Sequence, residues 1–575
     1  MERSSRSGLI IRHYGGEAIM LGFRGRFGVG VAAVATLVLA QAVIMAGPAA
    51  AAETAAPRTF DSEPLGQPPA GATVQGSVAV VSKLGGSGRA VQLTDNTASL
   101  QTKAYFPAPA VNSRHYEFDL AVTAWQSASL FAIRGSGDNP GLGVFRFMIT
   151  ANASTTVISV YDGSAWRTLA TEPISIRNTY RRFSVDATAD HAAVSLNGNR
   201  HSTTIKASAG SPITGIEFVS AGTAPVGSAA QLDNLVMYST VVALDPVGTQ
   251  IRFPDVTKLQ NGDLAVVYDS GAAHTNANED IKFVTSKDGG VNWSSPRVIE
   301  DGMFGDQHYD ARDPKISRLS DGTLLVSFFV TEWLAGGGSK QHGTHVIRSE
   351  DDGAHWSEPV EVDSAMDPDV SGGWNASHGA AVQLPNGDVL IPLYGKVPGD
   401  ATSRATVVRS TDGGRTFHRA NEVTVGSGGD VNFQEPNLSV LPDGSLACLI
   451  RMASASGGGI PARLSRSSDG GRTWSTPAIT DIYASSHHQL VTSTGAILLT
   501  WGAITPSTRP TYGQLIKNPA GSWDGIGEIR LYDTTRGDQA NPSSVEVSPG
   551  RFLTLGYDVS RRTLTAVFST VANYD

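Results

Sequence analysis

The stretch Ser467-Ser-Asp-Gly-Gly-Arg-Thr-Trp474 is one of four copies of a short pattern that organises this chain. The other copies begin at Ser286, Ser349 and Ser410, so that successive serines stand 63, 61 and 57 residues apart. Each copy combines an aspartate, which bonds nearby backbone groups, with glycines that permit positive φ and an aromatic residue that can pack. Turn chemistry at so regular a period indicates an array of all-β units.

A second repeat sets the number of units. Six hairpin signals, each a glycine between two apolar runs, have their glycines at Gly262, Gly322, Gly387, Gly444, Gly495 and Gly550. Each signal predicts two strands around a tight turn, and the aspartate pattern then separates a third strand from a fourth. Four strands in each of six units predict a six-bladed β-propeller, which leaves few exposed sheet edges. In that architecture the aspartate turns lie on the rim, so we expect them to be structural.

The first 52 residues are predicted to be a secretory signal region. Arg24 and Arg26 precede an apolar, alanine-rich run from Phe27 to Met45, and small residues follow it as a cleavage site. We therefore expect a secreted protein with no stable membrane insertion after cleavage. An uncleaved anchor is the alternative, because the run is about long enough to span a bilayer.

The propeller is expected over residues 244–575. Residues 58–240 have a different sequence pattern. Alternating runs such as Phe145 to Ile149 and Phe183 to Ala187 lack the sixty-residue period. They predict an antiparallel β-sandwich of jelly-roll type, so the fold class is all-β. The segment resembles the concanavalin-like (LamG-like) domains that accompany secreted carbohydrate enzymes. That resemblance implies either sugar binding or a spacer role.

Composition narrows the partners. The formal net charge is −9, which disfavours a nucleic acid or an anionic membrane as partner. The single cysteine, Cys448, lies in an apolar run and is expected in the core. Because no metal-ligand spacing occurs, we expect neither a metal nor another cofactor. We expect a monomer.

The propeller register locates a central funnel. In each unit the innermost strand should run from the funnel mouth to the hairpin glycine, so residues nine or ten positions before that glycine should ring the mouth. These residues are Arg252, Phe253, Arg312, Asp313, Ser377, His378, Gln434, Glu435, Ser485, Ser486, Ala540 and Asn541. The second strand returns seven residues after the glycine and adds Asp269, Phe329, Tyr394, Arg451, Gly502 and Tyr557. Charged groups at one register of successive repeats predict a polar pocket.

The propeller region resembles the sialidase superfamily, whose hallmark is the repeated aspartate box. Arg252-Phe-Pro254 is similar to the Arg-Ile-Pro motif of that family, and Glu435 and Arg451 match its Glu and Arg pair. Arg509 stands where a third arginine would be expected. Three guanidinium groups can hold one carboxylate because the planar fork matches it. The resemblance therefore implies a glycan substrate with a terminal anionic sugar, sialic acid first, and an exo-acting glycoside hydrolase. Four further residues are candidates for substrate binding: Arg312, His378, His488 and Asn541.

The chain departs from the family where the nucleophile is expected. Sialidases use a tyrosine, but Asn541 stands at that place in this sequence. Tyr557, on the neighbouring predicted strand, could replace it. Asp310 and Asp313 could instead form a carboxylate pair with Glu435, one protonated as the acid and one ionised as base or nucleophile.

Three functions fit these residues. The first is the sialidase-type hydrolase, with Glu435 as base or orienting group and Asp310 or Asp313 as acid. The second is another glycan-degrading enzyme, either an exo-arabinanase-like hydrolase or a uronate lyase that uses His378, His487 or His488 as base. The third is a lectin without catalytic activity, which the missing tyrosine would suit.

Overall fold

The computed structural model describes residues 58–574 except for twelve short gaps. The gaps are 97–100, 112, 124–127, 139–141, 189–190, 197–198, 211, 221–228, 245–248, 505–508, 533–538 and 560–561. The predicted secretory signal region therefore lies outside the described residues. Within them the protein is built from β-strands, with two short 3-10 turns at Arg419–Asn421 and Val571–Asn573.

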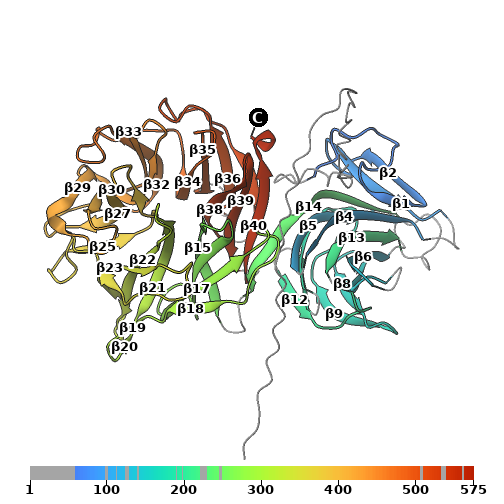
Figure 1. The fold of residues 1–575 in the computed structure, drawn as a ribbon. Helices are drawn as coiled ribbons and strands as arrows, with labels where there is room; N and C mark the ends of the chain where they lie inside the picture. The colour runs from blue at the N-terminus through green and yellow to red at the C-terminus, as the bar shows by residue number, and fades with distance from the viewer. Residues whose placement is uncertain are drawn as a thin grey trace, which may run out of the picture. The chain divides into compact units, whose positions relative to one another are not determined.

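The N-terminal part is a sandwich of two antiparallel sheets (Figure 1). The first sheet has the order β1 (Thr73–Gln75), β4 (Lys103–Val111), β13 (Ile213–Ser220), β6 (Ala128–Gly135), β7 (Phe145–Ala151), β8 (Thr156–Tyr161) and β9 (Trp166–Glu172). The second contains β12 (Asn199–Thr203), β11 (Ala192–Leu196), β10 (Arg181–Thr188), β5 (Ser113–Val122), β14 (Ala229–Leu244), β3 (Arg89–Thr94) and β2 (Ser77–Ser82). Alternate residues of these strands point inward. Phe118 packs edge-on against Phe131 and Phe218, with ring centroids 5.2 and 4.9 Å away.

The rest of the chain confirms the predicted six-bladed propeller. Blade one consists of β15 (Gln250–Lys258), β16 (Leu264–Gly271), β17 (Glu279–Ser286) and β18 (Arg297–Glu300). Blade two consists of β21 (Asp310–Arg318), β22 (Leu324–Trp333), β23 (Ser339–Ser349) and β24 (Val360–Glu361). Blade three consists of β25 (Trp374–Ser377), β26 (Val382–Gln383), β27 (Val389–Lys396), β28 (Arg404–Ser410) and β29 (Glu422–Gly426). Blades four and five are β30 (Val431–Val440) to β33 (Ala478–Ile479) with β31 (Leu446–Ser454) and β32 (Gly459–Ser467), and β34 (Ala484–Val491) to β37 (Ile529–Tyr532) with β35 (Ile497–Ala503) and β36 (Thr511–Ile516). A small hairpin of β19 (Met303–Phe304) and β20 (Gln307–His308) separates the first two blades.

The sixth blade is completed by a strand from much earlier in the chain. Its inner strands are β38 (Gln539–Ser548), β39 (Arg551–Asp558) and β40 (Thr563–Thr570). The fourth strand is the end of β14, where Ser239 pairs with Val567 and Leu244 with Thr563. The beginning of β14 lies between β3 and β5 of the sandwich. One continuous strand therefore belongs to both sheets, and it closes the ring so that the edge of β40 is paired.

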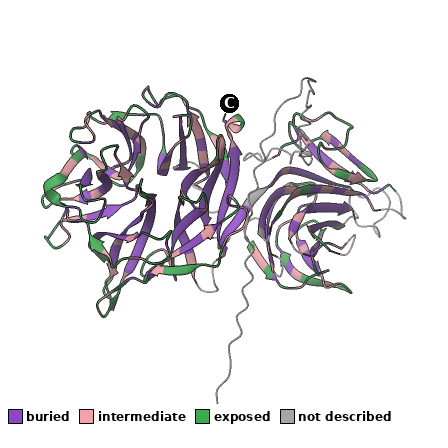
Figure 2. Ribbon diagram, in the orientation of Figure 1, coloured by how far each residue is buried: buried purple, intermediate pink, exposed green. Residues whose placement is uncertain are grey.

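The two sequence repeats form the turns of the blades. The six hairpin glycines have φ between 72° and 95°, a region that glycine enters without steric penalty. In the third box, Ser410 Oγ lies 2.6 Å from Asp412 Oδ1 and accepts the Gly414 N–H at 2.9 Å. Each box lies between the third and fourth strands of its blade, and Figure 2 shows buried residues concentrated in the strands. The blade turns thus join the strands at the ends opposite the mouth of the propeller.

In the described part of the chain, no helix is long and apolar enough to cross a membrane.

Candidate active site

Four innermost strands share a β-bulge directly before a proline. The bulge residues Phe253, Asp313, Glu435 and Asn541 have φ values of 49, 49, 46 and 43°. At each of them the pairing with the second strand shifts register. Positive φ is uncommon for residues other than glycine, and a following proline disfavours the right-handed helical region. Because a bulge re-aims its side chain, all four residues point into one central cavity.

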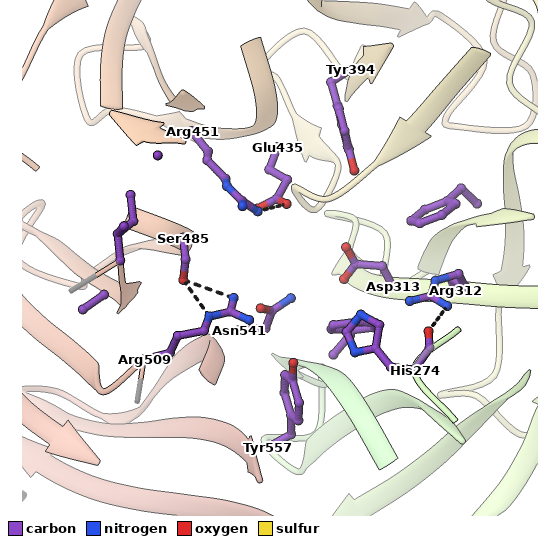
Figure 3. Close-up of a pocket in the computed structure, with 15 residues that line it drawn as sticks. His274, Arg312, Asp313, Tyr394, Glu435, Arg451, Ser485, Arg509, Asn541 and Tyr557 are labelled. Atoms are coloured by element: carbon purple, nitrogen blue, oxygen red, sulfur yellow. Dashed lines mark hydrogen bonds and ion pairs between the residues drawn. The ribbon is translucent and has the colours of Figure 1, made fainter. Parts of the chain in front are cut away.

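That cavity has a volume of about 540 Å³ and lies at the mouth of the propeller (Figure 3). The predicted site residues that line it are Asp313, Glu435, Tyr557, Arg312, Arg451, Arg509 and Asn541. The predicted residues Asp310, Arg252, His378 and His488 are not part of its wall. None of the aspartate-box residues is part of it either. The wall therefore combines two carboxylates with three guanidinium groups.

Asp313 is held by two nitrogen donors beneath the cavity. Lys315 Nζ lies 2.6 Å from Asp313 Oδ1, and His378 Nδ1 lies 2.6 Å from Asp313 Oδ2. Burial acts to raise the pKa of Asp313, but His378 and Lys315 outweigh it and hold that pKa well below its usual range. Asp313 is therefore the ionised carboxylate of the cavity.

Glu435 is the second carboxylate of the cavity. Its Oε1 forms an ion pair with Arg451 on β31, which pairs in register with the preceding residue, Gln434. Its Oε2 lies 3.7 Å from His378 Nε2 and has no hydrogen-bond partner among the described residues. His378 consequently stands between Asp313 and Glu435, one ring nitrogen turned to each. The two carboxylates face one cavity and share one imidazole.

Arg312 and Asp310 form a pair in which only the arginine reaches the cavity. Arg312 donates to Asp310 Oδ2 at 2.8 Å and to the His274 carbonyl at 2.7 Å. Trp333 Nε1 donates to the same Asp310 oxygen at 2.8 Å. Burial raises the pKa of Asp310, although the contact with Arg312 acts to lower it. The side chain is fully buried behind the cavity wall. Asp310 thus supports Arg312 and does not line the cavity.

Arg252 lies behind the cavity wall. The bulge turns Phe253 into the cavity, and Arg252 pairs in register with Asp269 on β16. Its guanidinium forms an ion pair with Glu279 and donates to the Ala273 carbonyl at 2.8 Å. Burial raises the pKa of Asp269 to about 7, although the two nearby arginines oppose this. Arg252 is therefore not part of the cavity wall, whereas Arg312, which the same register placed at the mouth, is.

Arg509 is the cavity arginine whose guanidinium contacts a neutral hydroxyl group instead of a carboxylate among the described residues. Its Nε and an Nη donate to Ser485 Oγ at 3.3 and 3.1 Å, and its φ is 53°. Among the described residues it has no carboxylate partner, whereas Arg451 and Arg312 each have one. Figure 3 shows Arg509 directed toward the same central space as Arg451 and Glu435. This arginine can bind an incoming anion without giving up an ion pair.

Two tyrosines reach the cavity from opposite sides, as Figure 3 shows. Tyr394 extends from β27 toward Asp313, and Tyr557 extends from β39. Burial, together with the charge of Glu435, raises the pKa of Tyr394, so its hydroxyl stays protonated at neutral pH. Tyr557 is fully buried within the protein core and packs edge-on against Phe253, with centroids 5.5 Å apart.

His488 belongs to the other end of the propeller axis. It lines a second opening formed by the far ends of the innermost strands, and its Nδ1 accepts the Ser544 N–H at 3.2 Å. Burial lowers the pKa of His488 to about 4, so the ring is neutral at physiological pH. His487 is buried as well, and its Nε2 lies 2.9 Å from the Leu449 carbonyl. Neither histidine lines the central cavity.

Sequence reasoning missed two residues of the site: His274 lines the cavity, and Lys315 holds Asp313 from below. It placed Ser485 and Tyr394 at the mouth without a role, and both line the cavity. The signal that finds the bulge residues is in the sequence: a proline follows Phe253, Asp313, Glu435 and Asn541 at the same register. A proline so placed in a strand marks a bulge or an edge. His274 lies in a loop between strands, which no periodic pattern locates.

Comparisons with known proteins agree with this fold. A family model described as a BNR repeat-like domain matches residues 262–552, just over half of the 575 residues. No curated protein matches the chain in sequence. A protein of unknown function from Dyadobacter fermentans is 21% identical with a TM-score of 0.51, covering 58% of this chain and 98% of that one. The NanB sialidase of Streptococcus pneumoniae is 12% identical with a TM-score of 0.50, covering 81% and 96%.

At these identities the likeness to solved structures shows a shared fold alone. The family model, by contrast, covers the innermost strands of blades two to six, from which Asp313, Glu435 and Asn541 enter the cavity. On this match and on the propeller itself, the protein is a member of the BNR repeat-like family and has the fold of sialidases.

Proposed function

We propose that this protein is a glycoside hydrolase that removes a terminal, anionic sugar from a glycan. The observation that carries the proposal is the pairing of two carboxylates, Asp313 and Glu435, in one cavity with Arg509, which has no carboxylate partner among the described residues. Two positioned carboxyl groups are the usual machinery of glycosidic bond cleavage. An arginine fork without an internal partner suits a sugar carboxylate.

Asp313 would supply the negative charge near the anomeric carbon. Its ionised carboxylate can attack that carbon or accept a proton from the attacking water, as the bond from that carbon to the leaving oxygen breaks. The configuration of the released sugar distinguishes these two routes. Direct attack followed by hydrolysis retains the configuration, and a single displacement by water inverts it.

Glu435 would donate a proton to the leaving oxygen as the bond between that oxygen and the anomeric carbon breaks. In the free protein Arg451 holds one of its oxygens in an ion pair. A substrate carboxylate bound to Arg451 and Arg509 would share that positive charge and would bring a second negative charge close to Glu435. Both effects favour the protonated form of a carboxyl group. Substrate binding would thereby prepare Glu435 to act as an acid.

The shape of the cavity supports cleavage at the end of a chain. It opens at one mouth of the propeller and is closed below by the buried network around His378. At about 540 Å³ it falls within the size range of small-molecule sites. Export from the cell is part of the proposal, because such glycans lie outside the cytoplasm and the N-terminal sequence has the features of a signal region.

A hydrolysis screen tests the proposal. The purified protein is incubated with a panel of sialosides, uronate-containing glycans and arabinans, and released sugars are identified by mass spectrometry. Release of one anionic monosaccharide, lost in Asp313→Asn and in Glu435→Gln, supports the proposal. Unsaturated products that absorb ultraviolet light would establish a lyase, and binding without turnover would establish a lectin; either result contradicts it.

A further inference from the structure

Lys315 is a buried lysine for which the chemistry above gives no role. It lies two residues after the bulge residue Asp313 on β21, and its side chain is 7% exposed. Asp313 lines the central cavity, whereas Ile316 and Ser317 line the second opening, of about 470 Å³, at the far ends of the innermost strands. Lys315 belongs to neither wall. It therefore lies inside the propeller, between the two openings.

The ammonium group of Lys315 points toward Asp313, the residue that lines the central cavity. Its hydrogen bond goes to Asp313 Oδ1, at 2.6 Å. A second carboxylate, Asp255 on β15, lies close, but its own oxygens accept the Ile316 N–H at 2.7 Å and the Ser543 hydroxyl at 2.6 Å. Asp255 thus joins blades one, two and six. Lys315 therefore gives its hydrogen bond to Asp313 and not to Asp255.

The charged and titratable groups around this pair come from several blades. They are Asp255 on β15, Asp269 on β16, Arg312 on β21, His378 after β25, Tyr394 on β27, Glu435 on β30 and His488 on β34. The Asp313 N–H donates to Asp269 Oδ2 at 3.3 Å. Burial acts to lower the pKa of Lys315, but Asp313 and Asp255 outweigh it and raise that pKa. The lysine consequently stays charged inside the protein.

A buried lysine needs a reason, because removing an ammonium group from water is costly unless the charge is paired. Replacing a buried ion pair with apolar side chains is often neutral or stabilising, so stability alone does not explain Lys315. The pair does fix Asp313: Lys315 occupies one carboxylate oxygen and His378 occupies the other. These two contacts restrain the Asp313 carboxylate in the orientation seen here.

We propose that Lys315 is a positioning residue, which from inside the propeller orients the Asp313 carboxylate toward the cavity and keeps it charged. This inference rests on the proposed function, in which Asp313 acts as the unprotonated carboxylate of the pair. It adds a division of labour. His378 lies between both carboxylates, whereas Lys315 contacts Asp313 alone of the two.

The test is the pH profile of kcat/KM for Lys315→Met, which keeps an unbranched side chain and removes the charge. Without the ammonium group Asp313 binds a proton more readily, so the acid limb should move upward by about one pH unit or more. At a pH on the acid limb of the wild-type profile, Lys315→Met should then retain about a tenth or less of the wild-type activity, both normalised to activity at about pH 8. Lys315→Arg, which keeps the charge, should restore most of the limb.

Lys282→Met is the matched control, because Lys282 Nζ lies 3.3 Å from Asp280 in a partly exposed pair outside the cavity wall. The control should leave the acid limb in place. If Lys315→Met lowers the urea midpoint but leaves the acid limb where it is in the wild type, Lys315 is a structural residue and the proposal is wrong. If Lys315→Met does not fold, Lys315→Gln, which keeps a hydrogen-bond donor and removes the charge, takes its place; an acid limb unchanged in Lys315→Gln would overturn the proposal.

A second readout separates this inference from the proposed function. If the wild-type protein hydrolyses no glycan, the proposed function fails, and acid unfolding still tests Lys315. A carboxyl group whose pKa is lower in the folded than in the unfolded protein stabilises the fold at pH values above its unfolded pKa. This stabilisation is lost as pH falls through the pKa that the group has in the folded protein. In Lys315→Met this loss should be smaller and should be complete at a higher pH than in the wild type. In a background of Asp313→Asn the shift should vanish; an unchanged shift would overturn the inference.

Discussion

Replacing Glu435 with glutamine should remove turnover and leave the fold intact. The side chain of Glu435 is 14% exposed and lines the cavity at a bulge, and its contact with Arg451 is an ion pair at the open mouth. Glutamine has the same length, and its amide oxygen can still accept from Arg451. What it cannot do is donate or accept the proton of a carboxyl group. The substitution thus removes the chemistry and little of the packing.

The two expected magnitudes differ widely. A partly exposed ion pair contributes about 0–1 kcal/mol, so the free energy of unfolding should change by no more than about 1 kcal/mol. A positioned acid or base contributes about 10²–10⁴ to the rate. At about 1.4 kcal/mol for each factor of ten, that loss corresponds to roughly 3–5 kcal/mol of the barrier. The loss of kcat/KM should therefore far exceed the loss of stability.

The assay measures initial rates on the substrate found in the glycan screen, and urea unfolding on the same preparations. Asp412→Ala is the contrasting variant, since Asp412 lies in the third aspartate box, none of whose residues lines the cavity. It accepts the Arg415 and Thr416 N–H groups, each at 3.0 Å. The reasoning is refuted if Glu435→Gln retains most of its activity, or if it lowers the free energy of unfolding by well over about 1 kcal/mol.

Four further outcomes follow from the same structure. Asp412→Ala should cost about 1 kcal/mol of unfolding free energy, at the low end because the box is exposed, and should leave specific activity intact, as measured on the folded fraction. Arg509→Gln should raise KM for an anionic substrate about tenfold or more and change kcat less, which steady-state kinetics would show; equal loss in both would contradict binding as its role. Burial raises the pKa of Glu300 to about 7, so the wild type should lose stability as pH rises from about 4.5 to about 7, and Glu300→Gln should flatten that part of the urea-midpoint profile. Burial also raises the pKa of the Cys448 thiol, so the native protein should resist a thiol reagent until it unfolds, and rapid native labelling would count against a closed fourth blade.

The repeats made the propeller predictable from sequence. Turn chemistry is local, because an aspartate and two glycines determine a tight turn without help from distant residues. The same register also found most of the cavity wall, including Asp313, Glu435 and Tyr557. The closing strand was a harder problem. Nothing in the sequence of β14 marks that one strand serves both the sandwich and blade six.

The placement of individual side chains was less predictable than the register. Residues on either side of a bulge occupy neighbouring positions in the sequence but point to different places, as Arg252 and Phe253 do. The protonation states depend on partners that are distant in the chain. Asp313 is ionised because His378, which lies on another blade, and Lys315 converge on it in three dimensions. Asp310, three residues earlier, has a raised pKa because burial prevails there.

The central claim is that the bulge carboxylates Asp313 and Glu435 direct water to a glycosidic carbon. The most direct measurement is hydrolysis in water enriched in heavy oxygen, with mass spectrometry of the released sugar. The account predicts that the heavy isotope appears at the anomeric carbon of that sugar with the wild-type protein and that release ceases with either carboxylate variant. A sugar released without the heavy isotope, or label incorporation that persists in Asp313→Asn and Glu435→Gln, would contradict it.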